Sequence, residues 1–171
     1  EIGWAALPGA RQALRRIARD NDVLTYLGEY QRARLDRALH GLTDLQRLAP
    51  GVDVDVFHPG VDGSEVRARH GLTGRPVIVC VSRLVPRKGQ DMLIRALPAI
   101  RRRVPGAALL LVSGGPYRKT LTRLAREHKV EKDVVFTGSV PWSELPAHYA
   151  AGDVYAMPCR TRSAGLDVEG L

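Results

Sequence analysis

A regular alternation of short apolar runs with amphipathic segments fills the chain from residue 76 onward, and it restricts the possible folds more than any other feature. The pattern predicts strands and helices over residues 76–82 (strand), about 90–103 (helix), 107–113 (strand), about 117–129 (helix), 133–138 (strand), 143–151 (short helix) and 153–157 (strand). Strands that alternate with helices in this way form a parallel sheet with helices on both faces. We therefore predict the α/β class.

Two segments show the pattern most clearly. Leu93, Ala96, Leu97 and Ile100 recur at the spacing of one buried helix face. Residues 107–112 are apolar throughout, as expected of a strand that is buried on both sides. We assign these residues to the core of the protein and not to a cofactor site.

The first third of the chain predicts a second, partial α/β domain. Its pattern indicates a helix over about 8–19, a strand over 23–26, a helix over 28–39 and a strand-like stretch over 45–48. We predict three parts: residues 1–59 as the carboxyl-terminal part of one domain, residues 60–75 as a polar, glycine-punctuated linker, and residues 76–171 as a truncated second domain. Since Glu1 replaces an initiating Met and residues 165–171 lie within a motif-like stretch, we expect a fragment of a longer protein.

The composition indicates a folded globular chain, because 44% of the residues are hydrophobic. The net charge of +8 has two explanations, an arginine-rich composition, which we favour, and an anionic partner. Seven arginines in the first third are candidates for a basic face toward a membrane surface or a phosphate-bearing acceptor: Arg11, Arg15, Arg16, Arg19, Arg32, Arg34 and Arg37.

Other residue types limit the possible functions. Cys80 and Cys159 are far apart in sequence, which argues against a disulfide framework or a paired metal motif. The five histidines lack the spacing of metal ligands, so we predict no metal. Ser82 and Ser113 have no evident His and acid partners, so a hydrolase triad is not supported. No apolar run is long enough to span a bilayer, and membrane contact is therefore expected to be peripheral.

The candidate site follows from the predicted sheet, because open parallel sheets bind ligands beyond the carboxyl ends of their strands. Four loops lie there: 83–88, with Arg83 and Lys88; 113–115, with Gly114 and Gly115; 138–141, with Gly138 and Val140; and the segment after 154–157, with Arg160, Arg162, Gly165, Asp167 and Glu169. Fixed cations such as Arg83 and Lys88 stabilise the negative charge that gathers on a departing diphosphate. Lysine is rare here, with four against 22 arginines, which makes Lys88 more notable than another arginine.

The motifs in these loops resemble a known family. They are 50–53 (PGVD), 81–89 (VSRLVPRKG), 114–115 (GG), 136–138 (FTG) and 169–171 (EGL), in the family's order. Together they resemble the retaining glycosyltransferases of family 4, which have the GT-B fold of two Rossmann-like parallel-sheet domains. Within that family, residues 157–162 (MPCRTR) and 165–171 (GLDVEGL) are similar to the actinobacterial GDP-mannose-dependent phosphatidylinositol mannoside mannosyltransferases.

The resemblance implies a role for each candidate residue. Arg83 and Lys88 would hold the donor diphosphate without a divalent metal, and the loop at Val140 would contact the nucleobase. Glu169 matches the first glutamate of a pair that orients the transferred sugar and the ribose; we count it with Arg83 and Lys88 as catalytic. Gly114, Gly115, Gly138, Val140 and Asp167 complete the predicted substrate-binding set, and no cofactor is expected besides the donor GDP-mannose.

The implied function is retaining transfer of an α-mannosyl unit from GDP-mannose to a phosphatidylinositol mannoside at the inner face of the cell membrane, with a cytoplasmic, peripheral enzyme and no nucleic-acid partner. Because both domains are incomplete, we expect this fragment to bind the donor weakly and not to turn over. One alternative is a family 4 enzyme that uses a UDP-sugar with another lipid or a small-molecule acceptor. Another is a non-catalytic nucleotide or nucleic-acid binding module, which a steep dependence of affinity on salt would reveal.

Overall fold

The computed structural model describes residues 7–41 and 44–160. The chain forms two compact units, one that extends to Val52 and one over Asp53–Cys159. The first unit contains α1 (Pro8–Arg19), β1 (Leu24–Tyr26), α2 (Glu29–Leu39) and β2 (Leu45–Arg47). β1 and β2 pair in parallel, with Leu24 opposite Leu45, so this unit is a β-α-β element preceded by a helix. Its four predicted helices and strands are confirmed to within two residues at each end.

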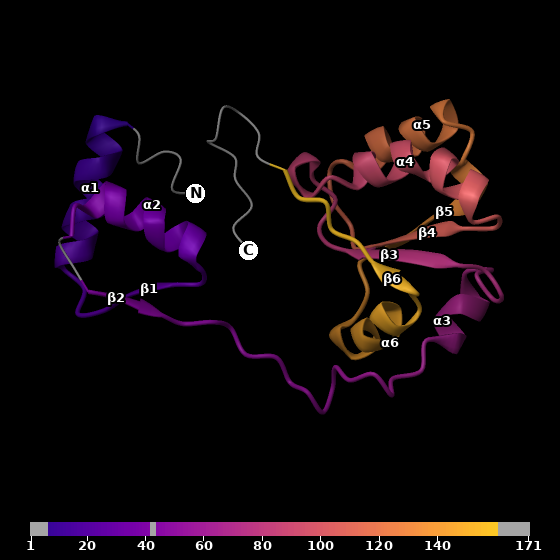
Figure 1. Cartoon of the computed structure of the whole chain (residues 1–171), viewed down its shortest axis with the longest axis horizontal. Helices are drawn as coiled ribbons and strands as arrows, with labels where there is room; N and C mark the ends of the chain where they lie inside the picture. Colours follow the sequence, from indigo (N-terminus) through magenta and orange to yellow (C-terminus); the bar gives the residue numbers. More distant parts are fainter. Residues whose placement is uncertain (1–6, 42–43, 161–171) are drawn as a thin grey trace. The chain divides into compact units, whose positions relative to one another are not determined.

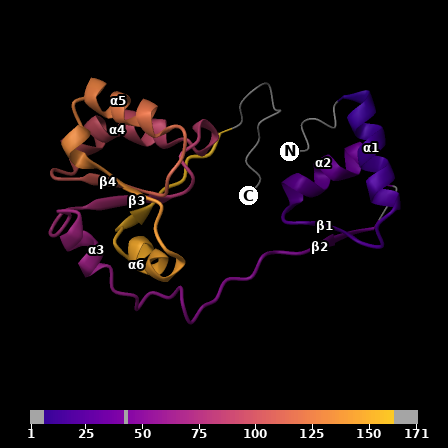
Figure 2. The ribbon, with the colours of Figure 1, turned by 180° about the vertical axis from the view of Figure 1, so that it is seen from behind.

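The second unit is a parallel four-stranded sheet between two helical layers (Figure 1). Its strands are β3 (Val77–Val81), β4 (Ala108–Val112), β5 (Val134–Gly138) and β6 (Val154–Tyr155), in the order β5-β4-β3-β6. Helices α4 (Gln90–Arg103) and α5 (Arg118–Glu127) cover one face, and α3 (Ser64–Arg69) and α6 (Leu145–Ala150) cover the other, as the reverse view also shows (Figure 2). Three short 3-10 turns complete it: η2 (Pro86–Lys88), η3 (Glu131–Asp133) and η4 (Trp142–Glu144).

Each face of the sheet has its own core. Side chains of a strand point alternately to opposite faces, so Leu109 and Leu111 of β4 pack under α4 and α5, whereas Leu110 and Val112 pack under α3 and α6. Every residue of β4 is at most 1% exposed, which explains why its sequence is continuously apolar. The predicted α/β class with a parallel sheet is confirmed.

The segment that the sequence predicted as a linker, 60–75, lies within the second unit. It contains α3, and Val66 and Leu72 are buried in the core beneath α3 and α6. Arg67 links α3 to the segment between α6 and β6. Its Nε donates to the Ala151 carbonyl at 3.0 Å, and its Nη2 donates to Asp153 Oδ1 at 2.7 Å. The structure therefore differs from the sequence interpretation here. The partners of Arg67 lie 84 and 86 residues farther along the chain, so no pattern in the local sequence indicates these contacts.

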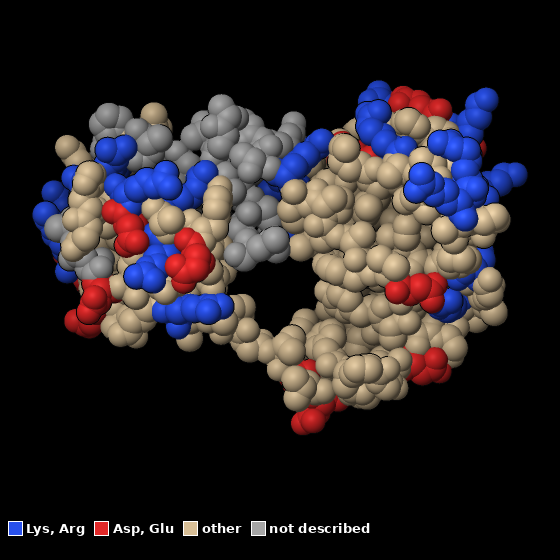
Figure 3. All heavy atoms as spheres, in the orientation of Figure 1, with Lys and Arg blue, Asp and Glu red and all other residues tan. Residues whose placement is uncertain are grey.

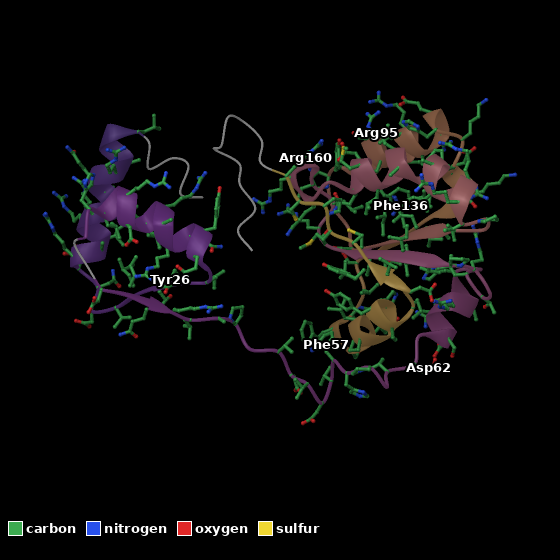
Figure 4. All side chains as sticks on the ribbon, viewed as in Figure 1. Tyr26, Phe57, Asp62, Arg95, Phe136 and Arg160 are labelled. Atoms are coloured by element: carbon green, nitrogen blue, oxygen red, sulfur yellow. The ribbon has the colours of Figure 1, made fainter. Side chains whose placement is uncertain are left out.

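An aromatic contact fixes the entry of the chain into the second unit, which begins at Asp53 and so before residue 60. Phe57 lies beside α6 (Figure 4), and its ring packs edge-on against Trp142 at 5.4 Å and Tyr149 at 6.0 Å between ring centroids. Offset and edge-to-face pairs of this kind stabilise by about 0.5–1.5 kcal/mol beyond the area they bury. The boundary between the two units therefore precedes Phe57.

A carboxylate with two arginine partners ties the amino-terminal edge of the sheet together. Asp133, 8% exposed and immediately before β5, accepts from Arg75 Nη2 at 2.6 Å and from Arg101 Nη1. Arg75 also donates from Nε to the Gly106 carbonyl at 2.9 Å. The segment before β3, the end of α4 and the start of β5 are thus joined at the edge opposite the predicted site.

We expect Asp133→Asn to lower the free energy of unfolding by about 1–3 kcal/mol, because it leaves two partly buried guanidinium groups without their carboxylate. Denaturant unfolding of the chain measures this directly. Asp22→Asn, at an exposed position of the first unit, is the control and should change the value by less than about 0.5 kcal/mol. Equal stability of both variants would contradict a structural role for Asp133.

Candidate functional site

The carboxyl ends of all four parallel strands of the second unit lie at one edge of the sheet (Figure 1). The chain runs from β3 to β4 to β5 and then returns to place β6 on the other side of β3. β3 is therefore the point where the strand order reverses and where the connecting helices change faces. A crevice for ligands forms beyond the strand ends at such a point.

The loop after β3 is bound to the loop after β4 through the backbone. The Leu84 N–H donates to the Gly114 carbonyl at 2.9 Å, and the Tyr117 N–H donates to the Leu84 carbonyl at 3.1 Å. Gly115 adopts φ +156°, and a Cβ there would lie 2.4 Å from the Leu84 oxygen. Only glycine fits this approach, so Arg83 is carried on a loop that is fixed to the end of β4.

Lys88 lies at the reversal point itself. Its Nζ is 3.9 Å from Met157 Sδ, in the segment just after β6. The following residue, Gly89, has φ +72°, and a Cβ there would lie 2.0 Å from the Pro158 carbonyl oxygen. Because α4 begins directly after this contact, the ammonium group of Lys88 and the positive end of a 14-residue helix lie at the same edge.

The loop after β5 contacts the loop after β4. The Ser113 N–H donates to the Gly138 carbonyl at 3.0 Å, and a Cβ on Gly114 would lie 3.1 Å from Ser139 Oγ. Val140 packs its side chain against the core under α3 and α6. The Val140 side chain is half-buried.

The structure places six of the eight candidate residues at this edge: Arg83, Lys88, Gly114, Gly115, Gly138 and Val140. Their chemical roles stay a prediction. Asp167 and Glu169 lie outside the described residues. Arg160, the last described residue, follows the segment after β6 (Figure 4).

Two further residues at this edge were missed by the sequence interpretation. Gln90, at the start of α4, is 0% exposed and contacts the loop that carries Arg83. Arg118, at the start of α5, lies over the ring of Phe136 with its Cζ 4.3 Å from the ring centroid. Polar residues in the first turn of a helix are usually exposed to solvent, so the local sequence does not distinguish Gln90 or Arg118 from ordinary surface residues.

The thiol next to the site is held neutral. Burial raises the pKa of Cys80, and Cys159 adds to the increase, while Ser82 and Lys88 oppose it. Burial together with Tyr149 likewise raises the pKa of the Tyr155 hydroxyl to about 12. Since a nucleophilic cysteine needs a lowered pKa, the environment of Cys80 does not favour thiolate chemistry.

Most of the positive charge lies elsewhere. On the face shown in Figure 3, Lys and Arg side chains gather over the α4 and α5 layer and over the first unit. In the first unit, two of these groups have partners on their own helix. Arg32 Nη1 lies 3.7 Å from Glu29 Oε2, and Arg34 Cζ lies 4.8 Å from the centroid of the Tyr30 ring. The charge of +8 is therefore spread over helix surfaces.

Residues 7–41 and 44–160, which the structure describes, contain no group of three or more His, Cys, Asp or Glu side chains arranged to hold a metal ion. None of the helices in the same ranges combines the length and the apolar character needed to cross a bilayer.

Comparison with known proteins identifies similar sequences over the whole chain. The family model described as "Glycosyl transferases group 1" matches residues 62–171. The GDP-mannose-dependent alpha-(1-6)-phosphatidylinositol monomannoside mannosyltransferase of Mycolicibacterium smegmatis is 59% identical over 172 residues, which cover 100% of this chain and 45% of that protein. The corresponding monoacylated-substrate enzyme of Corynebacterium glutamicum is 47% identical over 174 residues, again 100% of this chain and 45% of the relative. The chain thus spans less than half the length of these curated relatives.

Solved structures show the same fold at low identity. Sucrose-phosphate synthase from Thermosynechococcus elongatus superposes with a TM-score of 0.74 at 23% identity, over 88% of this chain and 38% of the other. The Anabaena protein HepE in complex with UDP-glucose gives 0.74 at 22% identity, over 88% of this chain and 43% of the other. These similarities establish the α/β architecture of GT-B glycosyltransferases for this chain.

The close approach at Gly115 generates a prediction about the loop that carries Arg83. We expect Gly115→Ala to lower the free energy of unfolding by about 2 kcal/mol or more, because its Cβ would meet Leu84 backbone atoms in a strained conformation. Gly114→Ala is the matched control, since its Cβ would lie 3.1 Å from the rotatable Ser139 hydroxyl and at an ordinary contact distance of 3.9 Å from the Ser139 backbone nitrogen. Thermal unfolding of both variants is the measurement, and an equal shift for the two would disprove the backbone clash.

Proposed function

This chain belongs to the glycosyl transferases group 1 family, and from that membership we propose that it is part of an enzyme that transfers an α-mannosyl unit from GDP-mannose to a phosphatidylinositol mannoside. The observation that carries the proposal is that Arg83 and Lys88 both lie in the segment between β3 and α4, at the point where the strand order reverses. The 59% identity over the whole chain to an enzyme named for that reaction supports the choice of donor and acceptor.

The two cations act on the leaving group. As the bond between the sugar carbon and the diphosphate oxygen breaks, its electron pair stays on the diphosphate, which gains negative charge. Arg83 offers a planar, two-pronged donor and Lys88 a compact charge, and the amino terminus of α4 adds its positive dipole at the same edge. Stabilisation of developing charge by such fixed groups is worth several kcal/mol in the transition state. We expect this arrangement to replace a divalent metal.

The neighbouring loops would hold the rest of the donor. The backbone around Gly138 and Val140 is proposed to contact the nucleobase, because the half-buried Val140 side chain packs against the core under α3 and α6. Gly114 and Gly115 would let the diphosphate or sugar approach the backbone at the end of β4. Asp167 and Glu169 are proposed to contact the sugar and the ribose. Retention of the anomeric configuration is part of the proposal.

The acceptor side is proposed from the first unit. Exposed arginines of α1, among them Arg16 and Arg19, form a surface suited to lipid phosphates. We propose that the complete enzyme works as a peripheral protein on the cytoplasmic face of the cell membrane. The acceptor hydroxyl forms the new bond to the sugar carbon, and its proton passes to the departing diphosphate oxygen.

A UDP-sugar donor is the second candidate, because HepE, which shares the fold, is named in complex with UDP-glucose. Titration of the full-length protein with GDP and with UDP separates the two. We expect GDP to bind at least about tenfold more tightly, a difference of about 1.4 kcal/mol. Tighter binding of UDP would replace the proposed donor, and a steep loss of affinity with salt for a long polyanion would favour the nucleic-acid alternative.

We expect Lys88→Ala in the full-length enzyme to lower turnover at least about tenfold, because it removes one fixed charge from the leaving diphosphate. Steady-state kinetics of mannosyl transfer from GDP-mannose measure the effect. Lys132→Ala is the control: it removes the same charge from an exposed position at the opposite edge of the sheet. Unchanged kinetics for the Lys88 variant would exclude this residue from the mechanism.

A further inference from the structure

Gln90 is a buried amide that follows the two candidate cations in the chain. It is 0% exposed, it follows Lys88 by two residues, and it is the first residue of α4. Its Nε2 donates to the Ser82 hydroxyl oxygen at 3.0 Å and to the Arg83 carbonyl oxygen at 3.0 Å. One side chain thus connects the helix that follows Lys88 to the residues that place Arg83.

The second of these hydrogen bonds completes the anchoring of one peptide group. The Arg83 carbonyl and the Leu84 N–H belong to the same peptide plane. Gln90 holds the carbonyl, and the Gly114 carbonyl accepts from the N–H at 2.9 Å. Because both ends of the plane are bound, its rotation is blocked, and with it the direction in which the Arg83 side chain leaves the backbone.

The residue before Arg83 is anchored as well. The Ser82 N–H continues the ladder of β3 by donating to the Val112 carbonyl at 3.1 Å, and its hydroxyl accepts from Gln90. Arg83 therefore stands between two fixed points, and Gln90 contributes to both. Catalytic groups require placement to within about half an ångström, which a loop achieves only with support of this kind.

The carbonyl oxygen of the Gln90 amide indicates that stability is not the reason for this residue. Oε1 is buried and accepts no hydrogen bond from the part of the chain that the structure describes. Burial of an unpaired polar atom is unfavourable, and an apolar side chain of the same length would avoid it. The position nevertheless holds a glutamine whose N–H groups point at Ser82 and Arg83.

We propose that Gln90 is a positioning residue, which sets Arg83 relative to Lys88 so that both cations act on the same diphosphate. The inference rests on the proposed function, since it assumes a diphosphate at this edge. Gln90 itself does not touch the ligand: its burial places it behind the loop.

A double-mutant cycle in the full-length protein tests the proposal. Gln90→Met keeps the length of the side chain and removes both hydrogen bonds. We expect it to lower kcat and GDP affinity at least about tenfold in the wild-type background. In an Arg83→Ala background the same change should cost less than about twofold, because the residue that it positions is already gone. Gln46→Met, at an exposed site of the first unit, is the control.

Other outcomes would overturn the proposal. Equal losses in both backgrounds would assign Gln90 a general structural role, and so would a Gln90→Met protein that does not fold. Wild-type behaviour of Gln90→Met would remove Gln90 from the site. If the wild-type protein transfers no mannose from GDP-mannose, the proposed function fails separately; the cycle is then measured on the affinities for GDP and UDP, and non-additivity there still decides the role of Gln90.

Discussion

The burial of β4 on both faces is the constraint on which the second unit depends. All five of its residues are at most 1% exposed, so the strand must lie inside the sheet and both faces must be covered. β3 and β5 pair on its two sides, and the helices that connect these strands lie above one face. The return of the chain to β6 then places α6 on the other face. The ligand edge is a consequence of this arrangement, because the strand order reverses at β3.

The site at that edge is built mainly by backbone contacts. Leu84 is bound to Gly114 and Tyr117, Ser113 is bound to Gly138, and Gly89 lies against Pro158. Each contact joins loops that follow different strands. The pairing of the strands therefore determines which loop residues lie next to one another. The side chain of Gln90 adds a hydrogen bond to the carbonyl of the peptide group between Arg83 and Leu84.

Periodicity predicted the strands and long helices because it is a local property of the chain. It missed α3, whose six residues bury only Val66 and are held through Arg67 by partners more than 80 residues away. It also missed the burial of Gln90 and Asp133, since their partners come from other segments. The loops at the strand ends were predictable, because the end of each strand is a local feature. What a polar side chain contacts there depends on tertiary structure.

The distribution of charge argues for a small anionic ligand over an extended one. Three arginines of the second unit away from the site are engaged in ion pairs: Arg67 with Asp153, Arg69 with Glu144, and Arg101 with Asp133. Exposed charges farther away than about 8 Å are largely screened at physiological salt. At the carboxyl edge of the sheet, by contrast, Arg83, Lys88 and the start of α4 converge over a short distance along the chain. A diphosphate is matched by such a compact set of donors, whereas a long polyanion requires cations spread along a continuous track.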